Sequence, residues 1–99
     1  MTATLIVLAT VNKQESNALK IYSAGVTDLM KTFGGNVIQK YFVQKIIMDD
    51  EAPEVVTVIE FPEMESINNF FNCEGYNRLL ASREKGFSNL QLLICDTGE

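Results

Sequence analysis

Two helical patterns alternate with β-rich segments along the chain, and this order limits the folds that it can adopt. Residues 5–11 are almost entirely apolar and bounded by polar residues, which predicts a strand. A helix follows, because apolar residues recur at spacings of three and four on one face: Leu19, Tyr22, Val26, Leu29 and Phe33. Gly34 and Gly35 are expected to end it, since glycine adopts the left-handed backbone of a helix C-cap without strain.

A hairpin is predicted in the middle of the chain. Residues 37–48 and 54–61 are rich in β-branched and aromatic side chains and predict two strands, with segment 49–53 as the turn. The turn and its neighbour hold four acidic residues: Asp49, Asp50, Glu51 and Glu54. They lack the ligand spacing of a known metal-binding loop, so we interpret them as a solvated charge run and predict no metal site.

A second helix and a last strand complete the order β-α-β-β-α-β. Residues 63–72 place apolar side chains on one helical face, Gly75 is expected to interrupt this helix, and residues 76–83 continue it. Gly86 should close it before a strand over residues 89–95. Right-handed crossovers turn this order into one α+β domain spanning the chain. We expect a four-stranded antiparallel sheet with both helices on one face and the first and third strands central.

The predicted strands carry apolar side chains on both of their faces. The first strand presents Leu5 and Val7 to one side, and Ile6 and Leu8 to the other. Two helices cover one face only, and leaving the other face in water would forgo roughly 1.5–3 kcal/mol for each large side chain. A second copy of the sheet, packed face to face, would bury that surface. We therefore predict a homodimer through the sheet faces, with a different partner protein as the alternative.

The overall charge and the apolar runs argue against nucleic acid and membrane partners. Eight basic and thirteen acidic side chains give a net charge of -5, which repels a phosphate backbone. No apolar stretch approaches the roughly 20 residues that span a bilayer, and the first residues lack the basic region of a signal peptide. We expect a cytoplasmic protein in which Cys73 and Cys95 are free, reduced thiols.

The chain contains no histidine. This removes the commonest general base near neutral pH, the usual haem ligand and the commonest zinc ligand. Nucleophile pairs of the Ser-His and Cys-His types are excluded as well. No cofactor is predicted.

Two charged residues are candidates for a site. Arg83 shares a helical face with Tyr76, where it could hold a ligand carboxylate at a pocket mouth, or pack along the helix and pair with a neighbouring acid. Glu60 lies near the end of an apolar strand. It could act as a general base if buried, or be an ordinary charge at the end of the sheet. The sequence leaves open which face of the sheet the Glu60 side chain lies on.

Aromatic residues on the helical stripes could line a pocket or simply fill the core: Tyr22, Tyr76, Phe70 and Phe71. Lys40 and Lys45 are interpreted as outer-face or edge charges of the second strand. We expect Cys73 to be a buried structural cysteine, because no basic neighbour in sequence would activate its thiol.

Several segments resemble a bacterial family catalogued as domain of unknown function 1330, in the dimeric α/β barrel superfamily. They are residues 58–62 and 70–76, Arg83, Tyr22 and Gly34-Gly35. The resemblance implies a ferredoxin-like monomer whose sheets pair into a barrel, with a pocket between sheet and helices and no settled activity. Lys40 stands where the family commonly has arginine, and Cys73 where it commonly has serine. Relatives in the superfamily include cofactor-independent monooxygenases, isomerases, haem enzymes and ligand-sensing modules, so the fold alone selects no function.

Three functional hypotheses follow. The first is a dimer that binds a small apolar or carboxylate-bearing ligand between sheet and helices, with Arg83 as the polar anchor. The second is a cofactor-independent oxygenase or isomerase that acts on a small aromatic or enolisable substrate, with Glu60 or a tyrosine assisting proton transfer. The third is a structural or regulatory dimer without a ligand.

Overall fold

The computed structural model of the chain describes residues 2–48 and 52–96. In chain order its elements are β1 (Ala3–Val11), the short 3-10 helix η1 (Lys13–Glu15), α1 (Ser16–Thr32), β2 (Asn36–Phe42), β3 (Val55–Phe61), α2 (Met64–Asn72), α3 (Glu74–Asn77), α4 (Leu80–Gly86) and β4 (Phe87–Cys95). The strands form one antiparallel sheet in the order β2-β3-β1-β4. The predicted topology and central strands are thus confirmed.

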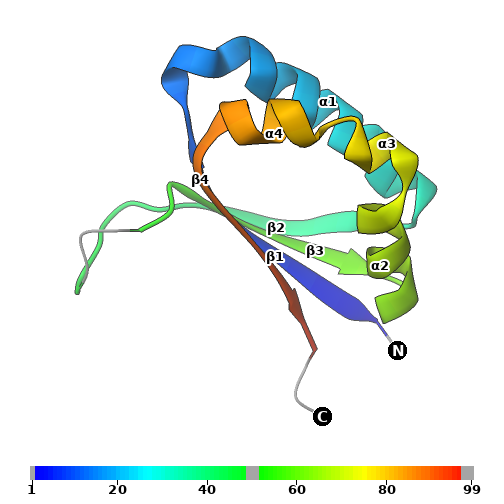
Figure 1. Cartoon of the computed structure of the whole chain (residues 1–99). Helices are drawn as coiled ribbons and strands as arrows, with labels where there is room; N and C mark the ends of the chain where they lie inside the picture. The colour runs from blue at the N-terminus through cyan, green and yellow to red at the C-terminus, as the bar shows by residue number, and fades with distance from the viewer. Residues whose placement is uncertain (1, 49–51, 97–99) are drawn as a thin grey trace.

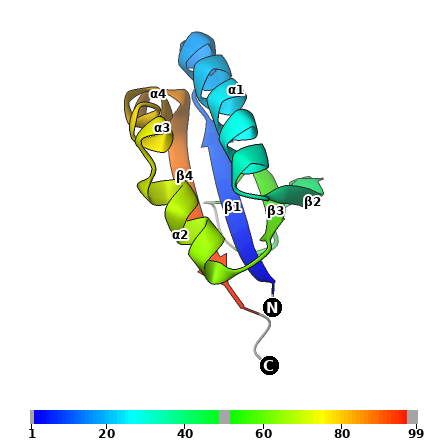
Figure 2. The same cartoon turned by 90° about the vertical axis from the view of Figure 1, so that its right-hand side faces the viewer.

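The helices form a single layer on one face of the sheet (Figure 1). Figure 2 shows α1 lying beside the row formed by α2, α3 and α4. The core lies between this layer and the sheet, where Leu5 and Phe61 from the strands meet Ile67 and Phe70 from α2. These four side chains are almost completely buried, as expected for large apolar residues that lie between the helix layer and the sheet.

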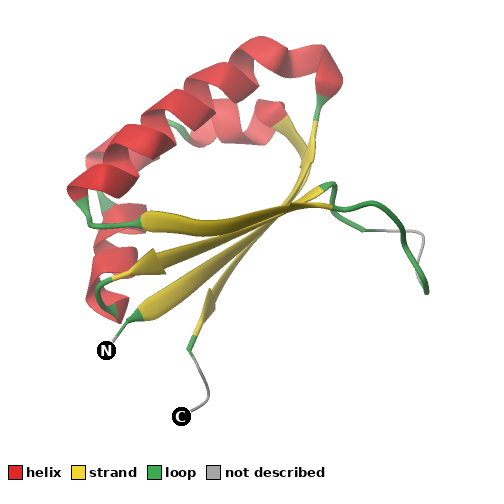
Figure 3. Ribbon diagram, turned by 180° about the vertical axis from the view of Figure 1, so that it is seen from behind, coloured by secondary structure: helices red, strands yellow, loops and turns green. Residues whose placement is uncertain are grey.

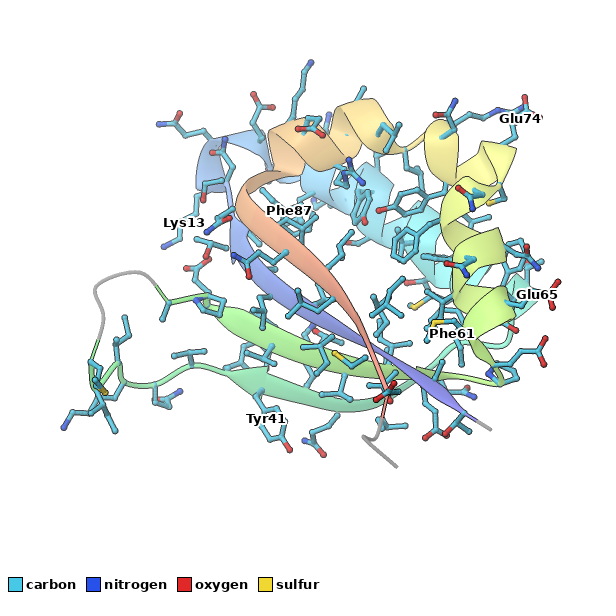
Figure 4. The ribbon with its side chains drawn as sticks, turned by 60° about the horizontal axis from the view of Figure 1, so that its bottom comes forward. Lys13, Tyr41, Phe61, Glu65, Glu74 and Phe87 are labelled. Atoms are coloured by element: carbon cyan, nitrogen blue, oxygen red, sulfur yellow. The ribbon has the colours of Figure 1, made fainter. Side chains whose placement is uncertain are left out.

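The other face of the sheet is not covered by any described element. Register pairs Ile6 with Val58 and Leu8 with Val56 across the two central strands, and all four side chains are half-buried. Tyr41 projects from β2 on the same side, away from the helices (Figure 4). We call this surface, with Leu93 of β4, the open face. The sequence-based expectation of apolar side chains on both faces is correct.

The second strand is shorter than predicted and ends at Phe42 rather than at residue 48. Beyond Phe42 one backbone hydrogen bond continues the pairing, from the N–H of Val43 to the carbonyl oxygen of Glu54, whereas the N–H of Glu54 donates to the carbonyl oxygen of Ala9 in β1. The hairpin itself is confirmed, with Phe42 opposite Val55. Asp49, Asp50 and Glu51 lie outside the described residues.

The second helical region breaks at Cys73 and not, as predicted, at Gly75. Cys73 is extended, with ψ at 156°, and its sulfur accepts a hydrogen bond from the backbone N–H of Tyr76 at 3.3 Å. It therefore caps α3, and Gly75 lies inside that helix. Cys73 is half-buried rather than buried, and both it and Cys95 are free. The last strand begins at Phe87, two residues before the predicted start, because it follows α4 without a loop.

None of the helices within residues 2–48 and 52–96 is long and apolar enough to cross a membrane.

Candidate functional site

A cavity of about 350 Å³ lies between α1 and the sheet. Its floor is made of buried side chains from three elements, among them Leu5 of β1, Ile59 of β3 and Tyr22 of α1. Phe70 and Phe71 of α2 also line it. A space of this size suits a small organic ligand, since such pockets begin at roughly 300 Å³.

The mouth of the cavity lies between α1 and β2, which diverge from the turn that joins them (Figure 3). Four exposed side chains line it there: Ser23 and Thr27 from α1, and Val37 and Lys40 from β2. The Thr27 hydroxyl donates to the carbonyl oxygen of Ser23 at 2.8 Å, so that hydroxyl is already used within the helix. Lys40 thus supplies positive charge at the mouth, above an apolar floor.

Sequence reasoning placed Lys40 on an outer face or an edge, and the structure shows why it missed the cavity. Val37 lies opposite Ile59 and faces the helices. Strict alternation would point residue 40 the other way, but the register shifts between Val37 and Gln39. This bulge inserts one extra residue, Ile38, and so turns Lys40 to the cavity side, opposite Thr57. No periodicity in the sequence signals a bulge at this position.

A hydrogen-bonded cluster lies behind the cavity floor. The hydroxyl oxygens of Tyr22 and Tyr76 are 2.7 Å apart and buried, and an Arg83 N–H donates to the Tyr76 hydroxyl at 3.3 Å. The Arg83 guanidinium also lies over the Tyr76 ring, 5.8 Å from its centroid. Its carboxylate partner is the exposed Glu84, at 3.2 Å, and not Glu60. Three predicted site residues are thus joined by polar contacts, and two more, Phe70 and Phe71, pack against the Tyr76 ring.

The cluster keeps its tyrosine neutral and its arginine charged. Burial is the main reason that the pKa of Tyr22 is raised above its usual value, and the hydrogen bond with Tyr76 adds to the shift. The same Tyr76 hydroxyl raises the pKa of Arg83 further, chiefly because it accepts a hydrogen bond from the guanidinium. Tyr22 is therefore a hydrogen-bonding group and not a base near neutral pH.

The two hydroxyls retain capacity for a ligand. Each carries one hydrogen, and the bond between the rings uses only one of the two. Arg83 fills an acceptor position on Tyr76 but takes no hydrogen from the pair. When Tyr76 donates to Tyr22, the Tyr22 hydrogen is left for an acceptor, and Tyr22 lines the cavity. A carbonyl or carboxylate oxygen fits this requirement.

Three of the predicted site residues do not line the cavity: Tyr76, Arg83 and Glu60. Arg83 instead lines a second space of about 350 Å³ together with Phe87 and the start of β4. Glu60 follows the buried Ile59 and precedes the buried Phe61, so alternation directs it to the open face, opposite Thr4. The question of its face is thereby answered.

Comparison with known proteins identifies a family and a fold. A family model described as "Domain of unknown function (DUF1330)" matches residues 3–97. No curated protein matches the chain.

Solved structures share the fold at low sequence identity. A protein of unknown function from Rhodopseudomonas palustris is 13% identical, with a TM-score of 0.84 over 99% of this chain and 83% of that one. A dimeric protein of unknown function and ferredoxin-like fold from Bacteroides fragilis is 8% identical, with a TM-score of 0.64 over 96% and 95%. SnoaB, a cofactor-independent oxygenase from Streptomyces nogalater, is 8% identical, with a TM-score of 0.67 over 99% and 94%. These likenesses establish the ferredoxin-like fold.

Proposed function

The chain belongs to the family described as Domain of unknown function (DUF1330), and from this starting point we propose that it is a homodimeric small-molecule-binding protein. The ligand of each subunit is a small apolar molecule that carries a carboxylate. One observation carries the proposal: an apolar cavity of about 350 Å³ has Lys40 at its mouth and Tyr22 in its floor.

Lys40 replaces Arg83 as the anchor that the sequence suggested. An apolar ligand body would rest on Ile59, Phe70 and Phe71, while its carboxylate meets the ammonium group of Lys40. Arg83 acts indirectly, because its hydrogen bond to Tyr76 holds the ring that positions the Tyr22 hydroxyl. The two roles predict different defects: loss of charge preference at Lys40, and loss of rigidity at Arg83.

The oxygenase or isomerase hypothesis has less support. Glu60 faces away from the cavity, and the raised pKa of Tyr22 keeps its hydroxyl protonated. Among the residues described as lining the cavity, none carries a carboxylate or a thiol. SnoaB shares the fold, but its activity belongs to a chain that is 8% identical. Ligand binding, unlike proton transfer, requires neither a carboxylate nor a thiol in the cavity.

The homodimer is supported by the open face. Its apolar residues lie on all four strands, and the helix layer covers only the opposite side (Figure 1). Packing two such faces together would bury the half-exposed Ile6, Leu8, Val56 and Val58 of both copies. A Bacteroides fragilis protein of this fold is described as dimeric. We also propose a cytoplasmic location, which suits the two free cysteines.

Binding is tested with a matched pair of ligands, 3-phenylpropionate and its uncharged amide, by calorimetry at low salt. We expect the wild-type protein to prefer the acid, and Lys40→Met to remove the preference while leaving the amide unaffected. Lys45→Met is the control, because it removes the same charge from an exposed position outside the cavity. Mass spectrometry of small molecules that copurify would identify the natural ligand. A wild-type protein that binds neither compound and copurifies with nothing contradicts the proposal.

Dimerisation is tested by sedimentation equilibrium. The wild-type protein should sediment at twice its 11.1 kDa chain mass. Val58→Lys should give a folded monomer, because it puts a charge at the centre of the open face. Ala24→Lys, on the exposed side of α1, should remain a dimer. A monomeric wild-type protein at micromolar concentration would refute the dimer.

A further inference from the structure

The space of about 350 Å³ beside Arg83 lies between α4 and the start of β4, and we call it the edge pocket. Leu92 of β4 lines it and pairs with Val7 of β1, which lines the cavity between α1 and the sheet, so both spaces lie on the helix side. Phe87 and Leu92 line both spaces and form the wall between them. The edge pocket is thus a separate space, and a dimer through the open face would leave it accessible.

The lining of the edge pocket is largely polar, unlike that of the cavity next to α1. Four of its seven lining residues are polar: Arg83, Glu84, Ser88 and Asn89. β4 is also an edge strand, so some of its backbone N–H and C=O groups point outward without a partner strand. Arg83 is the only cation among the residues described as lining this pocket. The pocket therefore offers one positive charge beside several hydrogen-bonding groups.

The Arg83 side chain is held in place before any ligand arrives. Its guanidinium donates to the Tyr76 hydroxyl at 3.3 Å and lies 5.8 Å from the centroid of that ring. Only 27% of the side chain is exposed. A planar guanidinium that is already ordered loses little further freedom when it binds an anion.

Most of the hydrogen-bonding capacity of Arg83 is still available. Within residues 2–48 and 52–96 its side chain donates once to Tyr76 and once to Glu84, so three of its five N–H groups remain. The Glu84 carboxylate, at 3.2 Å, is 73% exposed, and an exposed ion pair of this kind is readily exchanged for another. A ligand carboxylate could therefore take two parallel N–H groups of Arg83.

The surroundings of Arg83 select the type of anion. Glu84 lies beside it and the whole chain has a net charge of -5, so a phosphate dianion would be repelled more strongly than a carboxylate. The Ser88 hydroxyl donates to the carbonyl oxygen of Thr10 at 3.3 Å, and its oxygen can still accept a hydrogen bond. A ligand hydroxyl would fit this oxygen or the outward backbone groups of β4.

We propose that the edge pocket binds a small carboxylate that carries a neighbouring hydroxyl, with Arg83 as its anchor. This site is independent of the ligand proposed for the cavity next to α1, whose anchor is Lys40. Arg83 would then have two roles, because one N–H holds Tyr76 and others bind the carboxylate.

The first test follows the backbone amide signals by nuclear magnetic resonance while lactate is added at low salt, with lactamide as its uncharged match. We expect lactate, at concentrations up to about 10 mM, to shift the signals of residues 83–90 until they saturate, and lactamide to shift them little. Arg83→Met should abolish the response. Lys40→Met should retain it, because Lys40 lines the other cavity.

Three outcomes of this titration overturn the edge site. They are no response to lactate, shifts that spread over the surface without saturating, and a response that Lys40→Met abolishes. The last result would assign lactate to the cavity next to α1. Failure of 3-phenylpropionate to bind that cavity leaves the edge site intact, so the two proposals are tested separately.

The second test uses a variant that should gain affinity, which loss of folding does not explain. Glu84→Gln removes the carboxylate that competes for Arg83, so the dissociation constant of lactate should fall roughly two- to fivefold. Glu74→Gln is the matched control, because Glu74 is similarly exposed and pairs with Arg78 at 3.0 Å, outside the edge pocket. An unchanged constant in Glu84→Gln overturns Arg83 as the anchor. An equal fall in both variants does so as well, because net charge alone would then explain the gain.

Discussion

The hydroxyl oxygens of Tyr22 and Tyr76 lie 2.7 Å apart in a hydrogen bond that joins α1 to α3. The two rings also meet edge to face, with centroids 6.1 Å apart, and Tyr76 contacts both Phe70 and Phe71. Both tyrosines are buried, with 8% and 2% of their surface exposed. Such a pair is stabilising when complete and costly when halved, because the hydroxyl that remains loses its partner without regaining water.

A double-mutant cycle should reveal this asymmetry. Tyr76→Phe leaves the Tyr22 hydroxyl buried without its partner and should lower the free energy of unfolding by about 1–3 kcal/mol. The double variant Tyr22→Phe/Tyr76→Phe should lose less than the sum of the two single variants, since neither hydroxyl then needs a partner. Urea unfolding measures all four proteins. Strictly additive losses would show that the two hydroxyls do not depend on each other.

Tyr22 should also make the protein sensitive to alkali. Its pKa is raised in the folded state, so above the ordinary tyrosine value of about 10 the unfolded chain loses a proton that the folded chain keeps. The contribution of Tyr22 to stability is complete below that pH and is lost as the pH rises further. Urea unfolding measured from pH 8 to about 11 spans the ordinary tyrosine pKa of about 10. The free energy of unfolding should fall more steeply with pH for the wild-type protein than for Tyr22→Phe. Parallel curves would contradict the shift.

Much of the fold could be predicted because it depends on patterns that local sequence records. The apolar stripe of α1 and the β-rich segments around Val58 gave the correct order of elements and the correct central strands. The stripe placed Tyr22 on the buried side of α1 and left open whether it lined a pocket or filled the core, and in the structure it lines the cavity. These features follow from side-chain period and burial, which one sequence contains.

The cavity mouth could not be predicted, because it depends on pairing between distant residues. Lys40 turns inward only through the bulge at Ile38, and past Phe42 the N–H of Glu54 donates to Ala9 of β1, which is distant in the sequence. The helix break was misplaced for a related reason. Gly75 was expected to interrupt the helix, but the Cys73 sulfur caps α3 and the small glycine allows Leu29 to pack closely, within 2.8 Å of where a Cβ would lie.

Core packing predicts a contrast between two helical isoleucines. Ile67 of α2 has no exposed surface, whereas Ile21 of α1 is 54% exposed. Ile67→Ala should cost about 2–5 kcal/mol of unfolding free energy, because it removes buried methyl groups and leaves a cavity. Ile21→Ala should change the value by about 0.5 kcal/mol or less. Chemical denaturation compares them, and similar losses would mean that α2 is not docked as described.

The sulfur cap at Cys73 predicts opposite effects for two small substitutions. Cys73→Ser keeps an acceptor for the backbone N–H of Tyr76, and serine is a better N-cap, so stability should be equal to wild type or higher. Cys73→Ala removes the acceptor and should cost about 0.5–2 kcal/mol. Thermal unfolding under reducing conditions distinguishes the two. Equal stability of the serine and alanine variants would show that the cap contributes nothing.

Gly34 follows α1 in a left-handed backbone conformation, and this conformation predicts which residue can best replace the glycine. Its φ is 82°, in the left-handed region, and a Cβ there would lie 2.9 Å from the Pro62 ring. Gly34→Ala should therefore lower the unfolding free energy by at least about 1–2 kcal/mol. Gly34→Asn meets the same proline but tolerates the left-handed backbone better, so it should cost less. Equal losses of unfolding free energy in Gly34→Ala and Gly34→Asn would contradict the role of backbone strain. Contact with Pro62 would then be the reason that glycine is required at this position.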